Sequence, residues 1–360
     1  MKKWIALIIF TWIQAPAQPV SVPAISFSPS SYVCYKTNEL ISIDGKIDEA
    51  SWTQTEWTDD FVDIEGPSKP APRFRTRVKM LWDTLYLYIA AEVEEPDVWA
   101  TLTEHDAVIF YDNDFEMFID PDGDTHQYYE IEMNALNTVW ELLLIQPYRD
   151  GGPAVNGWDI PGLKNAVNVR GTLNKPGDRD EGWSVELAIP WRTLRECAHR
   201  NAPPKDGDQW RINFSRVEWK IEIADGMYHK VKNPETGKPF PEDNWVWSPQ
   251  GLINIHYPEM WGFVQFSDNI VGTSSETFSF RTEENVKWLL RQIYYAEKKY
   301  YSENGKYTHD TGLLTIPKVS LDGFLPDPRI VHTPNLFEAI IMSQDGKTAW
   351  HINQSGRTWH

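Results

Sequence analysis

Short segments in which apolar and polar residues alternate run through the chain from about residue 40 to residue 268, separated by turn residues. Residues 76–82 alternate in this way, Asp83 and Thr84 interrupt the pattern, and residues 86–90 resume it. The same pattern recurs at 114–120, 127–134, 139–144, 183–189, 210–217 and 261–266. Period-2 alternation with aromatic and β-branched residues predicts β-strands. Because no long helices separate them, these strands predict an all-β fold, an antiparallel β-sandwich of the jelly-roll kind over residues 38–268. Two stretches with many turn residues, 150–176 and 224–243, are predicted to be long irregular loops.

The pattern changes after residue 268. From Thr282 onward, apolar residues recur with helical spacing at Val286, Leu289, Leu290, Ile293 and Ala296, up to a stop signal at Asn304 and Gly305. This spacing predicts an amphipathic helix. Short strands near 337–342 and 348–352, joined by the turn residues 344–347, predict a hairpin. Residues 275–360 are therefore expected to form a small α+β unit.

The 360 residues carry 34 Lys and Arg against 52 Asp and Glu, a net charge of −18. Such acidity argues against nucleic acid and anionic lipid as partners, because binding to polyphosphates depends on basic side chains. A basic start at Met1–Lys3, an apolar run at 4–13 and the small residues Ala15 and Ala17 predict a secretory signal peptide over 1–17, followed by a leader segment, 18–37. We expect an exported protein, secreted, periplasmic or on the cell surface, with no membrane span after cleavage.

The chain has two cysteines, Cys34 and Cys197. In an oxidising compartment they can form a disulfide that ties the N-terminal segment to the body of the fold. Two separate buried thiols are the alternative.

The segments 114–120 and 127–134 form the most informative stretch. If the residues between them make a hairpin, one side of the two strands carries Phe115, Met117 and Ile119 toward the core. The other side carries the polar side chains Glu116, Glu130, Glu132 and Asn134. Carboxylates and amides beside aromatic rings are the groups that bind sugars, since the former accept hydrogen bonds from hydroxyls and the rings cover C–H surfaces. A solvated sheet face is the plain alternative.

Three further patterns have two interpretations each. Glu130 and Glu132 are two residues apart on one strand, a spacing near those of glycosidase carboxylate pairs, but neighbours on a strand point in parallel and do not flank a substrate. Asp120, Asp122 and Asp124 alternate as in half a calcium loop, although an ordinary Asp/Gly turn explains them as well. Trp247, followed by Ser248 and Pro249, is placed at a strand end, either as a stacking platform or as a core residue.

Four motifs together resemble family 9 carbohydrate-binding modules and their relatives, over about residues 38–268. They are Ile43–Trp52, Leu85–Tyr88, Asp112–Asp120 and Gly182–Trp191. The resemblance implies a sandwich of two antiparallel sheets, a sugar chain end held between aromatic rings, and structural calcium in some members. Matched by motif, the sugar-contacting acid falls on Glu116, one stacking Trp on Trp247, and the other ring on Phe110 with Tyr111 beside it. An arginine contact falls on Glu132 and a glutamine contact near Ser215 or Arg216, so the sugar specificity of the family does not carry over directly.

The α+β unit resembles the head of type IV pilin-like proteins more weakly, through Ile293–Glu297 and Tyr300–Tyr307. It is expected to contact a protein partner or to cap the sandwich.

The sequence therefore predicts an exported, non-catalytic carbohydrate-binding protein that requires no cofactor. Its site residues are Trp247, Phe110, Tyr111, Glu116, Glu132, Asn134 and Arg216. A glycoside hydrolase using acids on the same face is the second hypothesis. A haem-binding relative of the sandwich, with Met80, Met133 or His256 as ligands, is the third.

Overall fold

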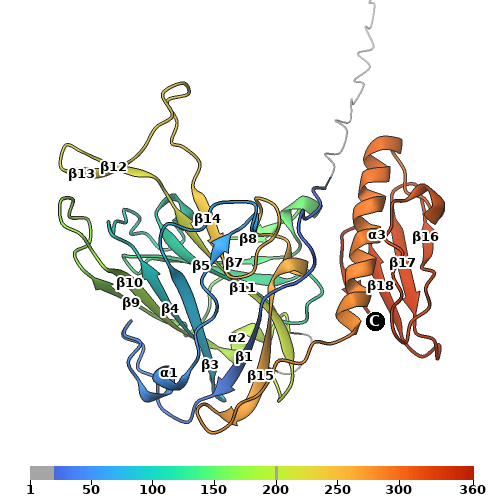
Figure 1. Cartoon of the computed structure of the whole chain (residues 1–360), viewed down its shortest axis with the longest axis horizontal. Coiled ribbons are helices and arrows are strands. Elements are labelled where there is room, and N and C mark those ends of the chain that lie inside the picture. The colour runs from blue at the N-terminus through green and yellow to red at the C-terminus, as the bar shows by residue number, and fades with distance from the viewer. Residues whose placement is uncertain (1–19, 199–201) are drawn as a thin grey trace, which may run out of the picture.

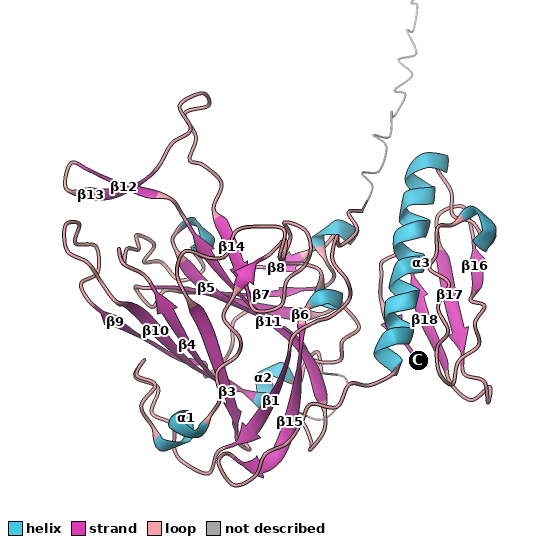
Figure 2. Ribbon diagram, in the orientation of Figure 1, coloured by secondary structure: helices cyan, strands magenta, loops and turns pink. Residues whose placement is uncertain are grey.

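The computed structural model describes residues 20–198 and 202–360. The predicted signal peptide, 1–17, lies outside these residues. Within the described residues, a sheet of 13 strands forms the body of the molecule, and its main path runs β8-β7-β6-β5-β11-β15-β1-β3-β4-β10-β9 (Figures 1 and 2). The strands are β1 (Ser31–Lys36), β2 (Val62–Asp63), β3 (Thr76–Trp82), β4 (Tyr86–Glu94), β5 (Asp114–Asp120), β6 (Tyr128–Asn134), β7 (Val139–Leu144), β8 (Ala154–Val155), β9 (Lys164–Arg170), β10 (Gly182–Pro190), β11 (Gln209–Glu218), β14 (Asp243–Val246) and β15 (Gly262–Ile270).

The sheet curls so that β3, β4 and β10 face β5, β6 and β11 across one hydrophobic core. Alternation along each strand explains this core, because every second side chain points inward. Val78 and Met80 on β3 and Met117 and Ile131 on β5 and β6 are all essentially inaccessible to solvent. The predicted β-sandwich is confirmed.

Two features of the sheet differ from the prediction. Residues 31–36, in the predicted leader, form β1, which pairs in parallel with both β15 and β3 and joins the two layers. The stretches predicted as loops also contain strands: β9 pairs with β10, and β12 (Ile221–Ala224) and β13 (Met227–Lys230) form a separate hairpin. These segments were missed because they are at best half-buried, so the alternation of apolar residues is weak in them.

A small helical and β unit follows β15. Helix α3 (Glu283–Asn304) packs on β17 (Phe337–Met342) and β18 (Ala349–Asn353), the centre of a four-stranded antiparallel sheet. Its edge strands are β16 (Arg329–His332) and β19 (Thr358–Trp359). The remaining helices are short: α1 (Ala50–Gln54), α2 (Trp191–Leu194) and the 3-10 turns η1 (Ile109–Tyr111), η2 (Tyr148–Asp150), η3 (Pro258–Met260) and η4 (Thr311–Leu313). Among the described residues, we find no helix with the length and apolar character that crossing a membrane requires.

The C-terminal unit packs against the sandwich through a second hydrophobic cluster. Tyr257 and Met260 of the sandwich join Leu290 and Ile293 of α3 in it. Phe27, from the segment before β1, stacks on Trp288 of α3 with ring centroids 4.6 Å apart. Figure 1 shows this N-terminal segment next to α3.

Candidate functional site

The β5–β6 hairpin places four acidic side chains on the outer face of its layer. Glu116 lies directly opposite Glu132, Phe118 opposite Glu130, and Asp114 opposite Asn134. The period of two turns Asp114, Glu116, Glu130 and Glu132 away from the core that Phe115 and Met133 enter. All four are buried nonetheless, with exposed fractions of 0, 6, 5 and 2% respectively.

Burial sets the electrostatics of these acids. Desolvation, and then the charge of neighbouring carboxylates, raises the pKa of Asp114, Glu130 and Glu132 well above the usual range. Desolvation raises the pKa of Glu116 to about 7, although an interaction with Ser215 opposes it. One oxygen of Glu132 accepts a hydrogen bond from the backbone N–H of Phe110 at 3.0 Å.

Two exposed tyrosines border this acidic cluster of Asp114, Glu116, Glu130 and Glu132. Tyr111 is 55% exposed and follows Phe110, whose half-buried ring lies 4.8 Å from that of Tyr111. Tyr148 is 48% exposed, and burial of its hydroxyl together with the charges of Glu130 and Glu132 raises its pKa to about 12. Phe110, Tyr111 and Tyr148 therefore border the acids with rings that are at least partly accessible.

Tyr148 was missed in the sequence. Its ring meets the edge of His256 at 4.6 Å, and His256 in turn bonds the Tyr128 hydroxyl at 3.0 Å. Tyr148 lies in η2, two residues before the stretch 150–176 that was predicted to be a loop. Only the folding of the chain brings it close to β6. The only local indication of an exposed ring at this position is that Tyr148 follows Pro147, since proline favours a surface turn.

The position of Trp247 corrects its predicted role as a stacking platform. Its side chain is 3% exposed and belongs to the sandwich core, where it lies 6.0 Å from the ring of Phe214. Gly262 passes so close that an added Cβ would lie 2.3 Å from the Trp247 ring. A ring packed in this way has no face free for a sugar, so the alternative of a core residue holds.

Arg216 and Asn134 are also occupied by the fold. Arg216 points into the sandwich, 1% exposed, and pairs with Glu95 at 2.8 Å and Glu218 at 2.7 Å. Asn134 is fully buried, donates to the Leu102 carbonyl and accepts from the backbone N–H of Leu136. Both predicted ligand contacts are corrected, because their hydrogen-bonding groups already serve the protein.

The Asp120, Asp122 and Asp124 turn contacts the C-terminal unit. One oxygen from each can approach the others within 4.8 Å, so these acids are chemically able to hold a hard cation. The oxygens of Asp120 accept the N–H groups of Gly123 and Thr125, and Asp124 pairs with Arg357 at 2.7 Å. These bonds account for the turn, and calcium at this position stays a prediction.

The structure separates the other candidate groups. Cys34 and Cys197 are free and buried, the alternative to the predicted disulfide. Met80 and Met133 are buried in the sandwich core, whereas His256 packs on Phe118 beyond the β5–β6 layer. The β5–β6 layer thus lies between His256 and both thioethers, so the structure does not assemble the haem ligands of the third hypothesis.

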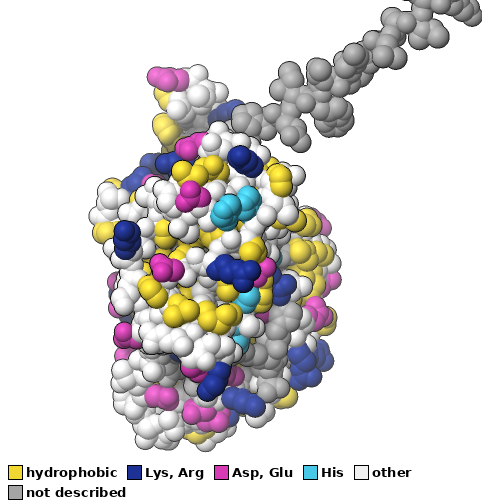
Figure 3. All heavy atoms as spheres, turned by 90° about the vertical axis from the view of Figure 1, so that its right-hand side faces the viewer, with side chains coloured by type: hydrophobic (Ala, Val, Ile, Leu, Met, Phe, Trp, Pro, Cys, Tyr) yellow, Lys and Arg dark blue, Asp and Glu magenta, His cyan; other side chains and the backbone are white. Residues whose placement is uncertain are grey.

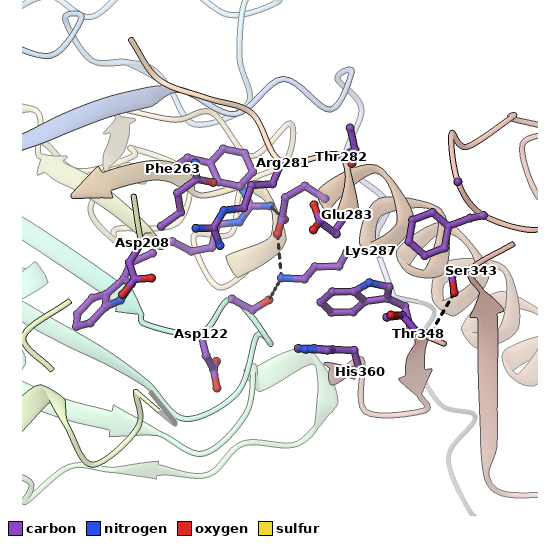
Figure 4. A pocket seen from close by; sticks show the side chains of 18 of the residues that line it. Asp122, Asp208, Phe263, Arg281, Thr282, Glu283, Lys287, Ser343, Thr348 and His360 are labelled. Carbon is purple, nitrogen blue, oxygen red and sulfur yellow. Dashed lines mark hydrogen bonds and ion pairs between the residues drawn. The ribbon is translucent and has the colours of Figure 1, made fainter. Parts of the chain in front are cut away.

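A cavity of about 720 Å³ lies between the sandwich and the C-terminal unit. Figure 4 shows Asp122 and Asp208 on one side and Thr348 and His360 on the other, with Lys287 between them. Lys287 pairs with Glu284 at 2.9 Å. None of the carbohydrate contacts predicted from the sequence lines this cavity.

The C-terminal unit shows a mixed surface on its side of the molecule. Figure 3 shows hydrophobic side chains interspersed with Lys or Arg, Asp or Glu and His. The unit exposes Leu325, Val331, Leu336 and Met342 by 37 to 53%. A protein partner at this unit stays a prediction.

The motif residues that carry the family resemblance are mainly structural. The Glu186 carboxylate accepts hydrogen bonds from the backbone N–H groups of Asp44 and Gly45 and from Trp52 Nε1, all at 2.9–3.0 Å. Asp112 similarly accepts from the N–H groups of Thr101 and Leu102. Glu186 and Asp112 therefore tie distant segments of the sandwich together.

Comparison with known proteins relates the sandwich to one family. Residues 43–209 match the model of the carbohydrate family 9 binding domain-like family. A stretch of 152 residues, 42% of this chain, is 25% identical to Exoglucanase XynX of Acetivibrio thermocellus, and that stretch is only 12% of the relative.

Two solved structures are also similar. A candidate carbohydrate-binding protein of Bacteroides uniformis is 17% identical with a TM-score of 0.48, covering 67% of this chain and all of the other. A family 9 carbohydrate-binding module of Caldicellulosiruptor kristjanssonii in complex with cellotriose is 16% identical with a TM-score of 0.41, covering 69% of this chain and all of the other. Over residues 43–209, the sandwich of this chain is therefore similar to the carbohydrate family 9 binding domain-like family.

Proposed function

We propose that this protein binds a carbohydrate on the outer face of the β5–β6 hairpin and does not cleave it. The family match of residues 43–209 is the observation that carries the proposal. The surface next to Glu116 and Glu132 supplies the chemistry, since acids there are bordered by the partly exposed rings of Tyr111 and Tyr148.

Both rings are held beside the same carboxylate. Tyr111 follows Phe110, whose N–H binds Glu132, and the charge of Glu132 acts on the Tyr148 hydroxyl. A pyranose lying against either ring would gain about 1 kcal/mol from the ring contact beyond the area it buries. Its hydroxyls would donate to the carboxylates, which fix its orientation. A site of this kind binds modestly and without a covalent step.

The arrangement of the acids supports binding rather than hydrolysis. Glycosidases place two carboxyl groups on either side of the scissile bond. Glu116, Glu130 and Glu132 instead project side by side from two paired strands, so no two of them face each other across a substrate. We also propose that the protein acts outside the cytoplasm, on the strength of the sequence pattern of residues 1–17.

A glycan array on the full chain, followed by calorimetric titration of the best ligand, tests the proposal. Tyr148→Ala and Tyr111→Ala are each expected to weaken binding roughly 10-fold. Phe280→Ala is the control, because this ring is 43% exposed but comes from the segment that leads into α3. Absence of binding to any glycan, or equal effects of all three substitutions, would refute the site.

The same ligand, incubated with the protein, separates binding from hydrolysis. We expect no new reducing ends over many hours. Release of reducing ends that Glu116→Gln and Glu132→Gln both abolish would show that the protein is a glycoside hydrolase.

A further inference from the structure

The acidic cluster of Asp114, Glu116, Glu130 and Glu132 brings four carboxyl groups together in a small buried volume. One oxygen each from Asp114, Glu116 and Glu132 lies within 4.8 Å of the other two. Glu130 is next to Glu132 in this group, since their carboxylates interact directly. Because the four side chains are 94% or more buried, water screens their repulsion poorly.

No basic side chain among the described residues pairs with these acids. The charges that act on them most strongly are those of other acids, including Asp112 and Glu242. The ammonium of Lys230, on which the charge of Asp114 acts, lies 3.4 Å from the centre of the Trp219 ring instead. Arg216 is on the opposite side of its strand and is engaged by Glu95 and Glu218.

Two oxygens of the cluster lack any hydrogen-bond partner within the described residues. They are Asp114 Oδ2 and Glu130 Oε2, each fully shielded from solvent. The other oxygen of Asp114 accepts the backbone N–H of Val217 at 3.1 Å. Asp112, two residues away, shows the contrast, because both of its oxygens accept hydrogen bonds from neighbouring groups. Unpartnered carboxylate oxygens in a dry site are costly, and a bound cation is one way to remove that cost.

We propose that Asp114, Glu116 and Glu132, assisted by Glu130, bind a divalent cation of the calcium class. Hard cations prefer carboxylate oxygens, and neither the sulfur nor the imidazole ligands typical of zinc occur in the cluster. The three oxygens lie within 4.8 Å of one another, close enough for one cation to contact all of them, and calcium accepts carboxylate ligands in more flexible geometries than magnesium.

This cation site shares the face of the proposed sugar site but does not depend on it. Should a sugar bind on this face, its hydroxyls are further oxygen ligands for the cation, and sugar affinity would then depend on calcium. Measuring cation binding without sugar keeps the two proposals separable.

The test is calorimetric titration of the EDTA-treated full chain with calcium chloride, together with terbium luminescence excited through the protein's aromatic rings. Glu116→Gln and Glu132→Gln are each expected to weaken calcium binding at least 10-fold and to reduce the terbium signal. Asp122→Asn is the matched control, because it removes one acid from the separate group at 120–124. Asp159→Asn is a second control, because it removes an exposed acid from the group of His105, Asp106 and Glu141. Both controls should leave the binding event that Glu116→Gln removes.

Misfolding cannot imitate the expected result. Glu116→Gln replaces a buried, desolvated carboxyl group by a neutral amide of similar shape, so in EDTA this variant should unfold at a temperature equal to or above that of the unmodified protein. The proposal is overturned if neither glutamine variant removes a binding event that the unmodified chain shows, and also if no heat or luminescence appears up to millimolar cation. If calcium fails to bind while sugar binds, only the cation site is refuted; the reverse result refutes the sugar site.

Discussion

Replacing Glu259 by glutamine is expected to loosen the junction between the sandwich and the C-terminal unit. Glu259, in η3 of the sandwich, is only 7% exposed and accepts hydrogen bonds from Arg149 at 2.9 Å and from the hydroxyl of Tyr295 on α3. Arg291 of α3 lies 3.6 Å away. One carboxylate therefore joins both parts of the molecule.

The magnitude follows from the pKa of Glu259. Burial alone would raise it, but the charges of Arg149 and Arg291 lower it from an ordinary value of 4.5 to about 2. Each pKa unit corresponds to about 1.4 kcal/mol, so the ionised carboxylate contributes about 3 kcal/mol to the free energy of unfolding at pH 7. Losing one partner of a buried ion pair costs a similar 3–5 kcal/mol or so.

The sign of the pH dependence is fixed by the direction of this shift. Because the folded pKa is below the unfolded one, the stabilisation is complete above about pH 4.5 and is lost as the pH falls toward 2. About 2 of the 3 kcal/mol should be gone by pH 3. Glu259→Gln should therefore lower the free energy of unfolding by about 3 kcal/mol at pH 7 but by only about 1 kcal/mol at pH 3.

Urea unfolding followed by tryptophan fluorescence at both pH values measures these differences. Glu235→Gln is the control, because Glu235 lies exposed in the loop after β13, and we expect it to change stability by less than about 0.5 kcal/mol at either pH. An equal loss at pH 7 and pH 3 would show that packing, and not charge, explains the effect. A loss below about 1 kcal/mol at pH 7 would refute the bridging role itself.

Three further outcomes are expected. Trp247→Ala should lower the free energy of unfolding by about 3–5 kcal/mol in thermal or urea unfolding, while the fraction that stays folded keeps its glycan affinity. Loss of glycan affinity without loss of stability would instead show that Trp247 stacks on the sugar. Gly45→Ala should lower the free energy of unfolding by more than about 1 kcal/mol, because Gly45 has φ +84° and an added Cβ would lie 2.6 Å from the Asn168 backbone nitrogen. An unchanged melting temperature would contradict this expectation. Cys34 and Cys197 should both resist a thiol reagent in the native protein and react in denaturant without reductant, whereas silence in denaturant would reveal a disulfide.

Local patterns were sufficient to predict the strands that build the core. In β5 and β6, alternation set both the extent of each strand and the side on which Glu116 and Glu132 lie, because the period of two is a property of the extended backbone alone. Helix α3 was predicted almost to the residue from its apolar spacing and from Gly305, which has φ +67° after its last turn. The edge strand β9 and the parallel strand β1 were missed, since partners distant in the sequence specify both.

The sequence alone could not decide whether an aromatic side chain contacts a ligand or packs in the core. Trp247 and Tyr148 are both aromatic residues next to a proline-containing turn, yet one is 3% and the other 48% exposed. What separates them is which segment packs over each ring: Gly262 on β15 covers Trp247, whereas His256 meets only one side of Tyr148. Residue type and strand period determine which side chains share a face of this protein. Whether that face is open, neutralised or filled depends on contacts between distant segments, and only the tertiary structure decides it.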